Sequence, residues 1–218
     1  MKKPKFVAIE GVDGCGKTYL SHKIVDWLND NDKDSAIYTS EPYDRSILDI
    51  EDGPAACDFY KDRILHFAKV IGPNQKLGKT VVCDRYQLST VVHNHSSELV
   101  FANIWFDKAF YVLSAAEYES FESCEYDMDP DCYIVIDRPV ADIAATLEAR
   151  GELKDREFSC VLHRREDFRI AARTFQTSTA YCLSRRRMVI IANTADEAFE
   201  KFKDYWNQCT DKDDDICW

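Results

Sequence analysis

The sequence predicts an α/β protein whose helices cover a central parallel sheet. Short apolar runs alternate with amphipathic segments along the 218 residues, and this order is typical of βαβ units, in which neighbouring strands are parallel. The first apolar run, residues 6–9, leads directly into a glycine-rich turn. In open parallel sheets ligands bind at the carboxyl ends of the strands, so we expect the functional site at that edge.

Strands are expected at the apolar runs that are bounded by polar or turn residues and have the length of buried strands. These runs are residues 6–9, 36–39, 80–83, 132–136 and 188–191.

Helices are expected where apolar side chains recur every three or four residues. In the first such segment Leu20, Ile24 and Leu28 share one face. Gly151, directly after the segment 140–150, is typical of a residue that ends a helix. The expected helices cover residues 18–28, 57–71, 140–150 and 196–206, and a long polar helix extends to residue 173.

The composition is that of a globular chain with one domain, residues 1–218. Hydrophobic residues make up 45% and charged residues 31%, which excludes disordered and collagen-like chains. No apolar run approaches the roughly 20 residues that span a bilayer, and Glu10 and Asp13 interrupt any signal-peptide segment. The net charge of −11 argues against a dedicated nucleic-acid binder. We therefore expect a cytoplasmic protein that binds neither membranes nor nucleic acids.

Cysteines and acidic residues give weaker indications. The nine cysteines include no Cys-x-x-Cys pair, so they predict reduced thiols instead of a zinc site or a disulfide framework. The acidic stretch 117–131 is expected to be a solvated surface excursion, and a partner-binding insertion is the alternative.

Residues 11–18 match the phosphate-binding pattern G-x-x-x-x-G-K-[ST], with an expected strand before it and an expected helix after it. In such a loop backbone N–H groups cradle phosphate oxygens, Lys17 reaches the β- and γ-phosphates, and the Thr18 hydroxyl binds Mg²⁺. Cys15 is interpreted as a small packing residue, with a reactive thiol as the alternative. The residues expected to bind ATP through this loop are Gly11, Gly14, Cys15, Gly16, Lys17 and Thr18.

The loop alone predicts a nucleoside triphosphate without saying what is done with it. No Asn-Lys-x-Asp motif of a GTPase is present, and the chain is too short for a motor protein. Its size suits a kinase of nucleosides or nucleotides.

Several further segments resemble the thymidylate kinase family, in the family's order. They are residues 9–18, 41–42, 59–66, 84–90, 129–131 and 149–153. The resemblance implies a three-layer fold like that of P-loop nucleoside monophosphate kinases, with a helical lid at about residues 150–173. It also implies transfer of phosphate from ATP to a pyrimidine deoxynucleoside monophosphate, dTMP above all, with Mg²⁺ as cofactor and a homodimeric assembly.

The resemblance assigns the base and sugar of the acceptor to particular side chains. Asp13 would accept a hydrogen bond from the 3′-hydroxyl, although it could instead stabilise its own loop. Phe59 would stack on the base, with core packing as the alternative. Arg63, one helical turn later, would donate to O4 of thymine, and the amino group of cytosine would leave that donor unpaired.

Further acceptor contacts are implied around the Glu-Pro motif. Glu41 and Pro42 would line the base pocket, with Pro42 near the thymine methyl group, and Thr90 would touch the base edge. His93 stands where the family commonly has a tyrosine that guards the 2′ side of the sugar, and it could equally be a satisfied core histidine. This departure affects the expected selectivity for deoxyribose.

The Asp-Arg-Tyr motif follows the expected strand 80–83. Arg85 would clamp the acceptor phosphate through its planar guanidinium, and Asp84 would act with Thr18 around Mg²⁺. A structural ion pair between Asp84 and Arg85 is the alternative.

The region 150–173 is rich in arginine. In the family the catalytic arginine comes from the phosphate loop or from the lid, and Gly14 stands at the loop position, so the lid should supply it. Arg156 is the expected catalytic arginine beside Lys17 and Arg85. Arg150 would lie against the adenine or the phosphates, and Asn193 belongs to the loop expected to close over adenine.

Two departures indicate a divergent member of the family, such as a viral one acting in the host cytoplasm. Tyr43, Asp44 and Arg45 replace the family's Gly-Gly-Thr, and the stretch 90–131 is longer and acidic. Two other functions stay open. A deoxynucleoside kinase would need a carboxylate base such as Glu41, and a degenerate nucleotide-binding module would act through its acidic surface.

Overall fold

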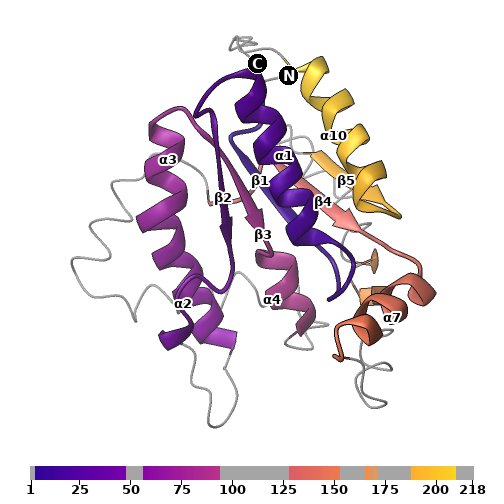
Figure 1. Cartoon of the computed structure of the whole chain (residues 1–218). Coiled ribbons are helices and arrows are strands. Elements are labelled where there is room, and N and C mark those ends of the chain that lie inside the picture. Colours follow the sequence, from indigo (N-terminus) through magenta and orange to yellow (C-terminus); the bar gives the residue numbers. More distant parts are fainter. Residues whose placement is uncertain are drawn as a thin grey trace.

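A computed structural model describes residues 3–47, 56–93, 128–152, 165–167, 169–170 and 188–209. Its sheet has five parallel strands in the order β2-β3-β1-β4-β5 (Figure 1). The strands are β1 (Phe6–Glu10), β2 (Ala36–Ser40), β3 (Thr80–Asp84), β4 (Cys132–Ile136) and β5 (Met188–Ala192). The predicted α/β class and every predicted strand are confirmed.

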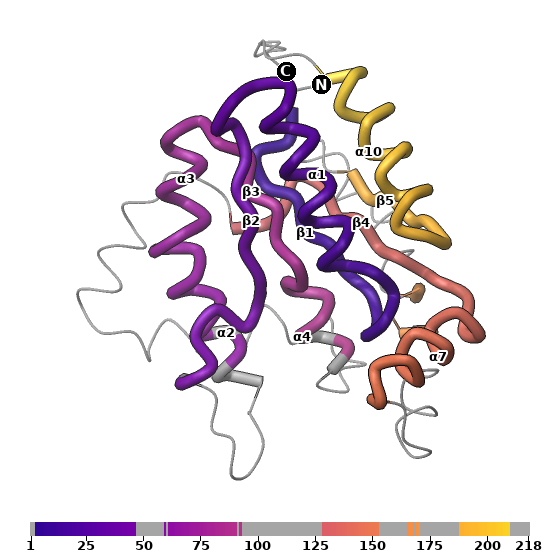
Figure 2. Tube along the Cα trace, in the orientation of Figure 1, coloured from indigo at the N-terminus to yellow at the C-terminus, as the bar shows by residue number. Residues whose placement is uncertain are grey.

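The register of the sheet brings polar residues together at its carboxyl edge. The central strand β1 pairs with β3 and with β4, and Ile9 lies opposite Asp84. Every residue of β1, β3 and β4 is buried, so polar side chains are placed where these strands end. Figure 2 shows the chain leaving β1, β3 and β4 at the same edge.

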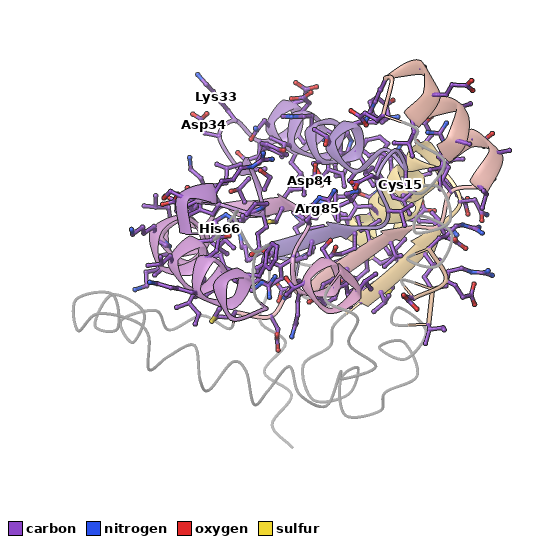
Figure 3. All side chains as sticks on the ribbon, turned by 90° about the horizontal axis from the view of Figure 1, so that it is seen from below. Cys15, Lys33, Asp34, His66, Asp84 and Arg85 are labelled. Carbon is purple, nitrogen blue, oxygen red and sulfur yellow. The ribbon has the colours of Figure 1, made fainter. Side chains whose placement is uncertain are left out.

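Helices pack on both faces of the sheet (Figures 1 and 3). They are α1 (Lys17–Asn31), α2 (Ala56–His66), α3 (Gly72–Lys76), α4 (Gln87–His93), α7 (Val140–Ala149) and α10 (Ala195–Gln208). A π-helical turn, Phe67–Ile71, joins α2 to α3. The predicted face of Ile64, Phe67 and Ile71 is fully buried. Within the described residues, no helix is long and apolar enough to cross a membrane.

The first and last helices are held together by aromatic side chains. The Trp27 ring of α1 makes edge contacts with Phe199, Phe202 and Trp206 of α10, at centroid distances of 6.1, 6.2 and 6.2 Å. The Thr194 hydroxyl accepts a hydrogen bond of 3.0 Å from the backbone N–H of Glu197 and caps α10. The helix that follows the phosphate loop is thus anchored to the C-terminal part of the fold.

The helix α4 was not among the predicted elements. It is seven residues long, and its N-terminus is capped by the buried carboxylate of Glu10 at the end of β1. Oε1 of Glu10 accepts hydrogen bonds from the backbone N–H groups of Tyr86, Leu88 and Ser89 at 2.9, 2.9 and 3.2 Å. Oε2 accepts one from the Ser89 hydroxyl at 2.5 Å. A cap supplied from more than 70 residues away leaves no local signal in the sequence.

Candidate functional site

Two glycines of the loop after β1 have positive φ angles and lie close to other elements. Gly11 has φ 139°, and a Cβ there would lie 2.8 Å from the backbone oxygen of Ile136 and 2.9 Å from Sγ of Cys15. Gly14 has φ 79°, and its Cβ would lie 3.2 Å from the side chain of Leu147. The loop is therefore pressed against β4 and α7, and its backbone curves as a phosphate cradle requires.

A pocket opens where this loop enters α1. Gly16 precedes the helix in a left-handed conformation, and the first-turn N–H groups of a helix have no acceptor within that helix, which makes its N-terminus a site for anions. The pocket has a volume of about 140 Å³ and is lined by Asp13, Gly14, Gly16, Lys17, Thr18, Tyr19, Asp84, Arg85 and Arg150. The structure thus brings predicted donor-site residues from three parts of the chain to one place.

The side chain of Cys15, a residue of the loop, is buried. Its side chain is 1% exposed, and burial raises the pKa of the Cys15 thiol. A thiol that is buried and protonated is unreactive, so the geometry favours the packing role over the reactive one.

Thr18 and Asp84 form an oxygen-rich pair in the pocket. The Thr18 hydroxyl donates to Oδ2 of Asp84 at 2.5 Å, and the Asp84 residue is 6% exposed. Among the described residues, none makes a hydrogen bond to the buried Oδ1 atom of Asp84. A buried carboxylate oxygen and a hydroxyl are the hard ligands that Mg²⁺ prefers, so these residues fit the predicted metal.

Asp84 and Arg85 each contact the phosphate loop instead of each other. Arg85 has φ 71°, and this left-handed backbone turns its guanidinium onto the carboxylate of Asp13. Figure 3, which views the carboxyl edge, places Asp84 and Arg85 between Cys15 on one side and His66 on the other. The structural ion pair between Asp84 and Arg85 does not form, and Arg85 pairs with Asp13 of the loop instead.

The residues predicted to bind the acceptor include a buried guanidinium on α2. Arg63 is 2% exposed and donates to both carboxylate oxygens of Glu41, from Nε at 3.2 Å and from Nη2 at 2.7 Å. Nη2 also donates to the Thr90 hydroxyl at 2.5 Å, and the guanidinium carbon lies 4.7 Å from the centroid of the Tyr86 ring. Three residues predicted to read the base, Glu41, Arg63 and Thr90, therefore form one hydrogen-bonded group.

Phe59, one helical turn before Arg63 on α2, and Pro42, which follows Glu41, are half-buried. The loop that replaces the family's Gly-Gly-Thr is held by Asp62, whose carboxylate accepts the backbone N–H groups of Tyr43 and Asp44 at 2.8 and 2.6 Å. Burial raises the pKa of Asp62. The loop after Pro42 is thus held against α2 by a residue to which the sequence analysis assigned no role.

Two more residues were missed by sequence reasoning although both follow the predicted strand 132–136. Arg138 donates from Nη1 to the carbonyl oxygen of Gly14 and to the Thr146 hydroxyl, both at 3.0 Å, and so ties the phosphate loop to α7. The Asp137 carboxylate forms ion pairs with Nε of Arg165 at 2.8 Å and of Arg169 at 3.0 Å. Their position at the carboxyl end of a strand was the available signal.

The lid is described only at residues 150–152, 165–167 and 169–170, so Arg156 lies outside the described residues. His93 is the last residue of α4, and its side chain also lies outside the description. Asn193 follows β5, is exposed, and donates its backbone N–H to Oε2 of Glu197 at 2.8 Å.

Comparisons with known proteins agree with this geometry. The family model described as thymidylate kinase matches residues 9–182. The probable thymidylate kinase of Pyrococcus abyssi is 30% identical over 166 residues, which cover 69% of this chain and 73% of that protein. The probable thymidylate kinase of Caldivirga maquilingensis is 31% identical over 162 residues, covering 68% and 70%. The crystal structure of thymidylate kinase from Ehrlichia chaffeensis has the same fold, with a TM-score of 0.56 at 20% identity over 92% of this chain and 97% of that one.

Proposed function

Because this chain belongs to the thymidylate kinase family, we propose that it transfers the γ-phosphoryl group of ATP to the 5′-phosphate of dTMP, giving dTDP and ADP. The observation that carries the proposal is the placement of two groups of side chains at one edge of the sheet. Asp84 and Arg85 line the phosphate-loop pocket, and the buried group of Glu41, Arg63 and Thr90 includes the residue that follows β2, the strand paired with β3.

On the donor side, the backbone N–H groups of the loop and the Lys17 ammonium hold the phosphates of ATP. Thr18 and Asp84 hold Mg²⁺, and the buried Oδ1 of Asp84 supports this assignment. When bound, the metal neutralises charge on the β- and γ-phosphates. The base of ATP lies toward Arg150 and Asn193.

On the acceptor side, Arg85 clamps the 5′-phosphate, and Asp13, which Arg85 contacts across the pocket, accepts the 3′-hydroxyl. Phe59 stacks on the base, while Arg63 donates to O4. The acceptor phosphate needs no general base because its second pKa is about 6, so it is an anionic nucleophile at neutral pH. The work of the protein is to hold two anions in line, and Arg156 of the lid adds a further positive charge.

The rival reading as a deoxynucleoside kinase requires Glu41 as a base for a neutral 5′-hydroxyl. Both oxygens of this buried carboxylate already accept hydrogen bonds from Arg63, which supports the monophosphate as acceptor. Homodimeric assembly is a further prediction that rests on the family resemblance, and one domain over residues 1–218 and a cytoplasmic location are predictions that rest on length and composition.

The proposal is tested by measuring ADP release with thymidine and with every common nucleoside monophosphate as acceptors. We expect the highest kcat/KM with dTMP and negligible turnover of thymidine. A preference for thymidine would establish the deoxynucleoside kinase, and tight ATP binding without turnover of any acceptor would establish the degenerate module.

A further inference from the structure

His66 lies directly beneath the group that is expected to read the base, and none of its surface is exposed. It is the last residue of α2, and its imidazole is contacted on several sides. Nε2 lies 2.6 Å from the Thr39 hydroxyl, and the Tyr43 ring stacks on the imidazole with a centroid distance of 5.0 Å and an angle of 4°. Nδ1 points to Oε1 of Glu41 at 3.5 Å.

These contacts determine where the imidazole carries its proton. If Nε2 donated to Thr39, a neutral ring would turn the bare lone pair of Nδ1 toward the Glu41 carboxylate, which is repulsive. If the Thr39 hydroxyl donates to Nε2, Nδ1 carries the proton and presents an N–H group to Glu41. Within the described residues, Nδ1 makes no hydrogen bond, and the Glu41 carboxylate is the acceptor that it faces. The second arrangement is therefore the favourable one.

The carboxylate that His66 faces also controls the orientation of Arg63. Glu41 accepts from Nε and Nη2 of Arg63, so the plane of the carboxylate fixes the plane of the guanidinium. A carboxylate without further contacts can rotate and carry the guanidinium with it. The imidazole limits this rotation, because its Nδ1 atom lies 3.5 Å from Oε1, the oxygen that also accepts from Nε of Arg63.

We propose that His66 is a positioning residue that determines the selectivity of this kinase for a pyrimidine with oxygen at position 4. It acts through Glu41, which holds Arg63 in the orientation that donates to O4. The inference rests on the proposed function, because it assumes that Arg63 meets the base of dTMP.

The loop after Pro42 covers the imidazole of His66. Tyr43 stands where the family has glycine, and its ring seals His66 from water. The Asp62 carboxylate holds Tyr43 in place through its backbone N–H at 2.8 Å. The departure from the family pattern thus becomes part of the base-reading site, since a hydrogen bond in a water-excluded place orients its partners more strictly.

Two substitutions separate the roles of the two ring nitrogens. The amide nitrogen of His66→Asn falls near the position of Nδ1 and can donate to Glu41, whereas that of His66→Gln falls near Nε2 and cannot. For each variant we would measure KM and kcat for dTMP and for dCMP, which carries an amino group at position 4, together with KM for ATP and the melting temperature. Thr39→Val, which removes only the hydroxyl, serves as an independent variant.

His66→Gln should lower the ratio of kcat/KM for dTMP over dCMP by about tenfold, because the buried Glu41 carboxylate loses the N–H group that faces it. The loss should come from KM for dTMP, with KM for ATP unchanged. His66→Asn should keep the ratio within about threefold of wild type, and Thr39→Val should shift it in the same direction as His66→Gln.

An unchanged ratio in His66→Gln and Thr39→Val would overturn the inference alone, provided that the wild type phosphorylates dTMP. An equal loss in both His66 variants that follows their melting temperatures would also overturn it, because a packing role predicts that result. Absence of dTMP turnover in the wild type would instead overturn the proposed function.

Discussion

Lys17 is held beside the pocket by its own surroundings. Its Nζ atom donates to the carbonyl oxygen of Val12 at 2.8 Å and lies 3.7 Å from Oδ1 of Asp13, and the residue is 6% exposed. A cation that is already ordered next to the phosphate loop needs little reorganisation when anionic oxygens arrive. Its contribution should therefore appear in the rate of transfer.

Replacement of Lys17 by alanine should lower kcat with dTMP and ATP by about 10³-fold or more, because the charge that stabilises the transferring phosphoryl group is lost. The matched control is Lys23→Ala on the same helix, whose ammonium pairs with exposed Asp196 at 2.6 Å. The control should keep wild-type kcat in the ADP-release assay. Comparable losses in both variants would contradict the assignment of Lys17.

Arg85, which we propose to bind the acceptor phosphate, has an unfavourable backbone conformation. Its φ of 71° lies in the left-handed region, which costs a residue with a Cβ about 1–2 kcal/mol. Such outliers persist where the surrounding structure demands them, often at functional sites. Here the turn from β3 into α4 directs the guanidinium toward Asp13.

Two substitutions at this position should separate strain from chemistry. Arg85→Gly removes the backbone strain and Arg85→Ala keeps it. The free energy of unfolding, measured in urea, should therefore be about 1 kcal/mol higher for the glycine variant than for the alanine variant. Both should lose acceptor binding to the same extent, since both lack the guanidinium. A glycine variant less stable than the alanine variant would show that the backbone is not strained.

Single residues differ in how far the sequence reveals them. The roles of Lys17 and Thr18 follow from a local pattern whose mechanics are general. Asp62 and His66 carry no such signal, because each acts on a segment about 20 residues away in sequence or more, through contacts that exist only in the folded chain.

At the scale of elements, the carboxylate of Glu10 links β1 to α4. It accepts the N–H groups at the start of the helix that carries Thr90. Burial raises the pKa of Glu10 from its ordinary value of 4.5 to about 7. The cap is therefore fully charged only at alkaline pH.

This pKa shift predicts a pH dependence of stability. The folded protein binds the Glu10 proton more tightly than the unfolded chain, so the associated stability is fully present below pH 4.5 and is lost as the pH rises through about 7. The Glu10→Gln variant keeps an acceptor oxygen and has no proton to lose. From pH 5 to pH 8, the wild type should therefore lose about 2–3 kcal/mol of unfolding free energy relative to this variant.

Urea unfolding of both proteins at several pH values measures this difference, in which the other titrating groups cancel. A difference that stays constant with pH would mean that Glu10 titrates at its ordinary value in the folded protein.

The elements also show what patterns can and cannot predict. Apolar runs located all the strands of the sheet because three of them are buried on both sides and tolerate no polar residue. The helix α4 was not predicted because it is short and contains the β-branched residues Thr90, Val91 and Val92. It also depends on a cap from β1. Local propensity there opposes the helix, and tertiary contacts overcome it.

At the scale of the molecule, the parallel sheet sets the geometry of the reaction. The strands β1 and β3 are adjacent, so the phosphate loop that follows one and the Asp84–Arg85 pair that follows the other meet at one edge. The strand β2 pairs with β3 on the side away from β1. The loop after β2 therefore brings Glu41 to the side of Asp84 and Arg85 that faces away from the phosphate loop. The order β2-β3-β1 thus places the residues proposed for the acceptor site, for the phosphate clamp and for the donor site in a row.

Binding of one molecule that spans this row tests the central claim most directly. Adenosine and thymidine joined through their 5′-oxygens by five phosphates carry both bases and the full chain of anions. We predict that this compound competes with both ATP and dTMP in steady-state inhibition and binds far more tightly than either, because one ligand gains the contacts of two. Competition with ATP alone would mean that the group of Glu41, Arg63 and Thr90 does not hold the acceptor, and would contradict the account.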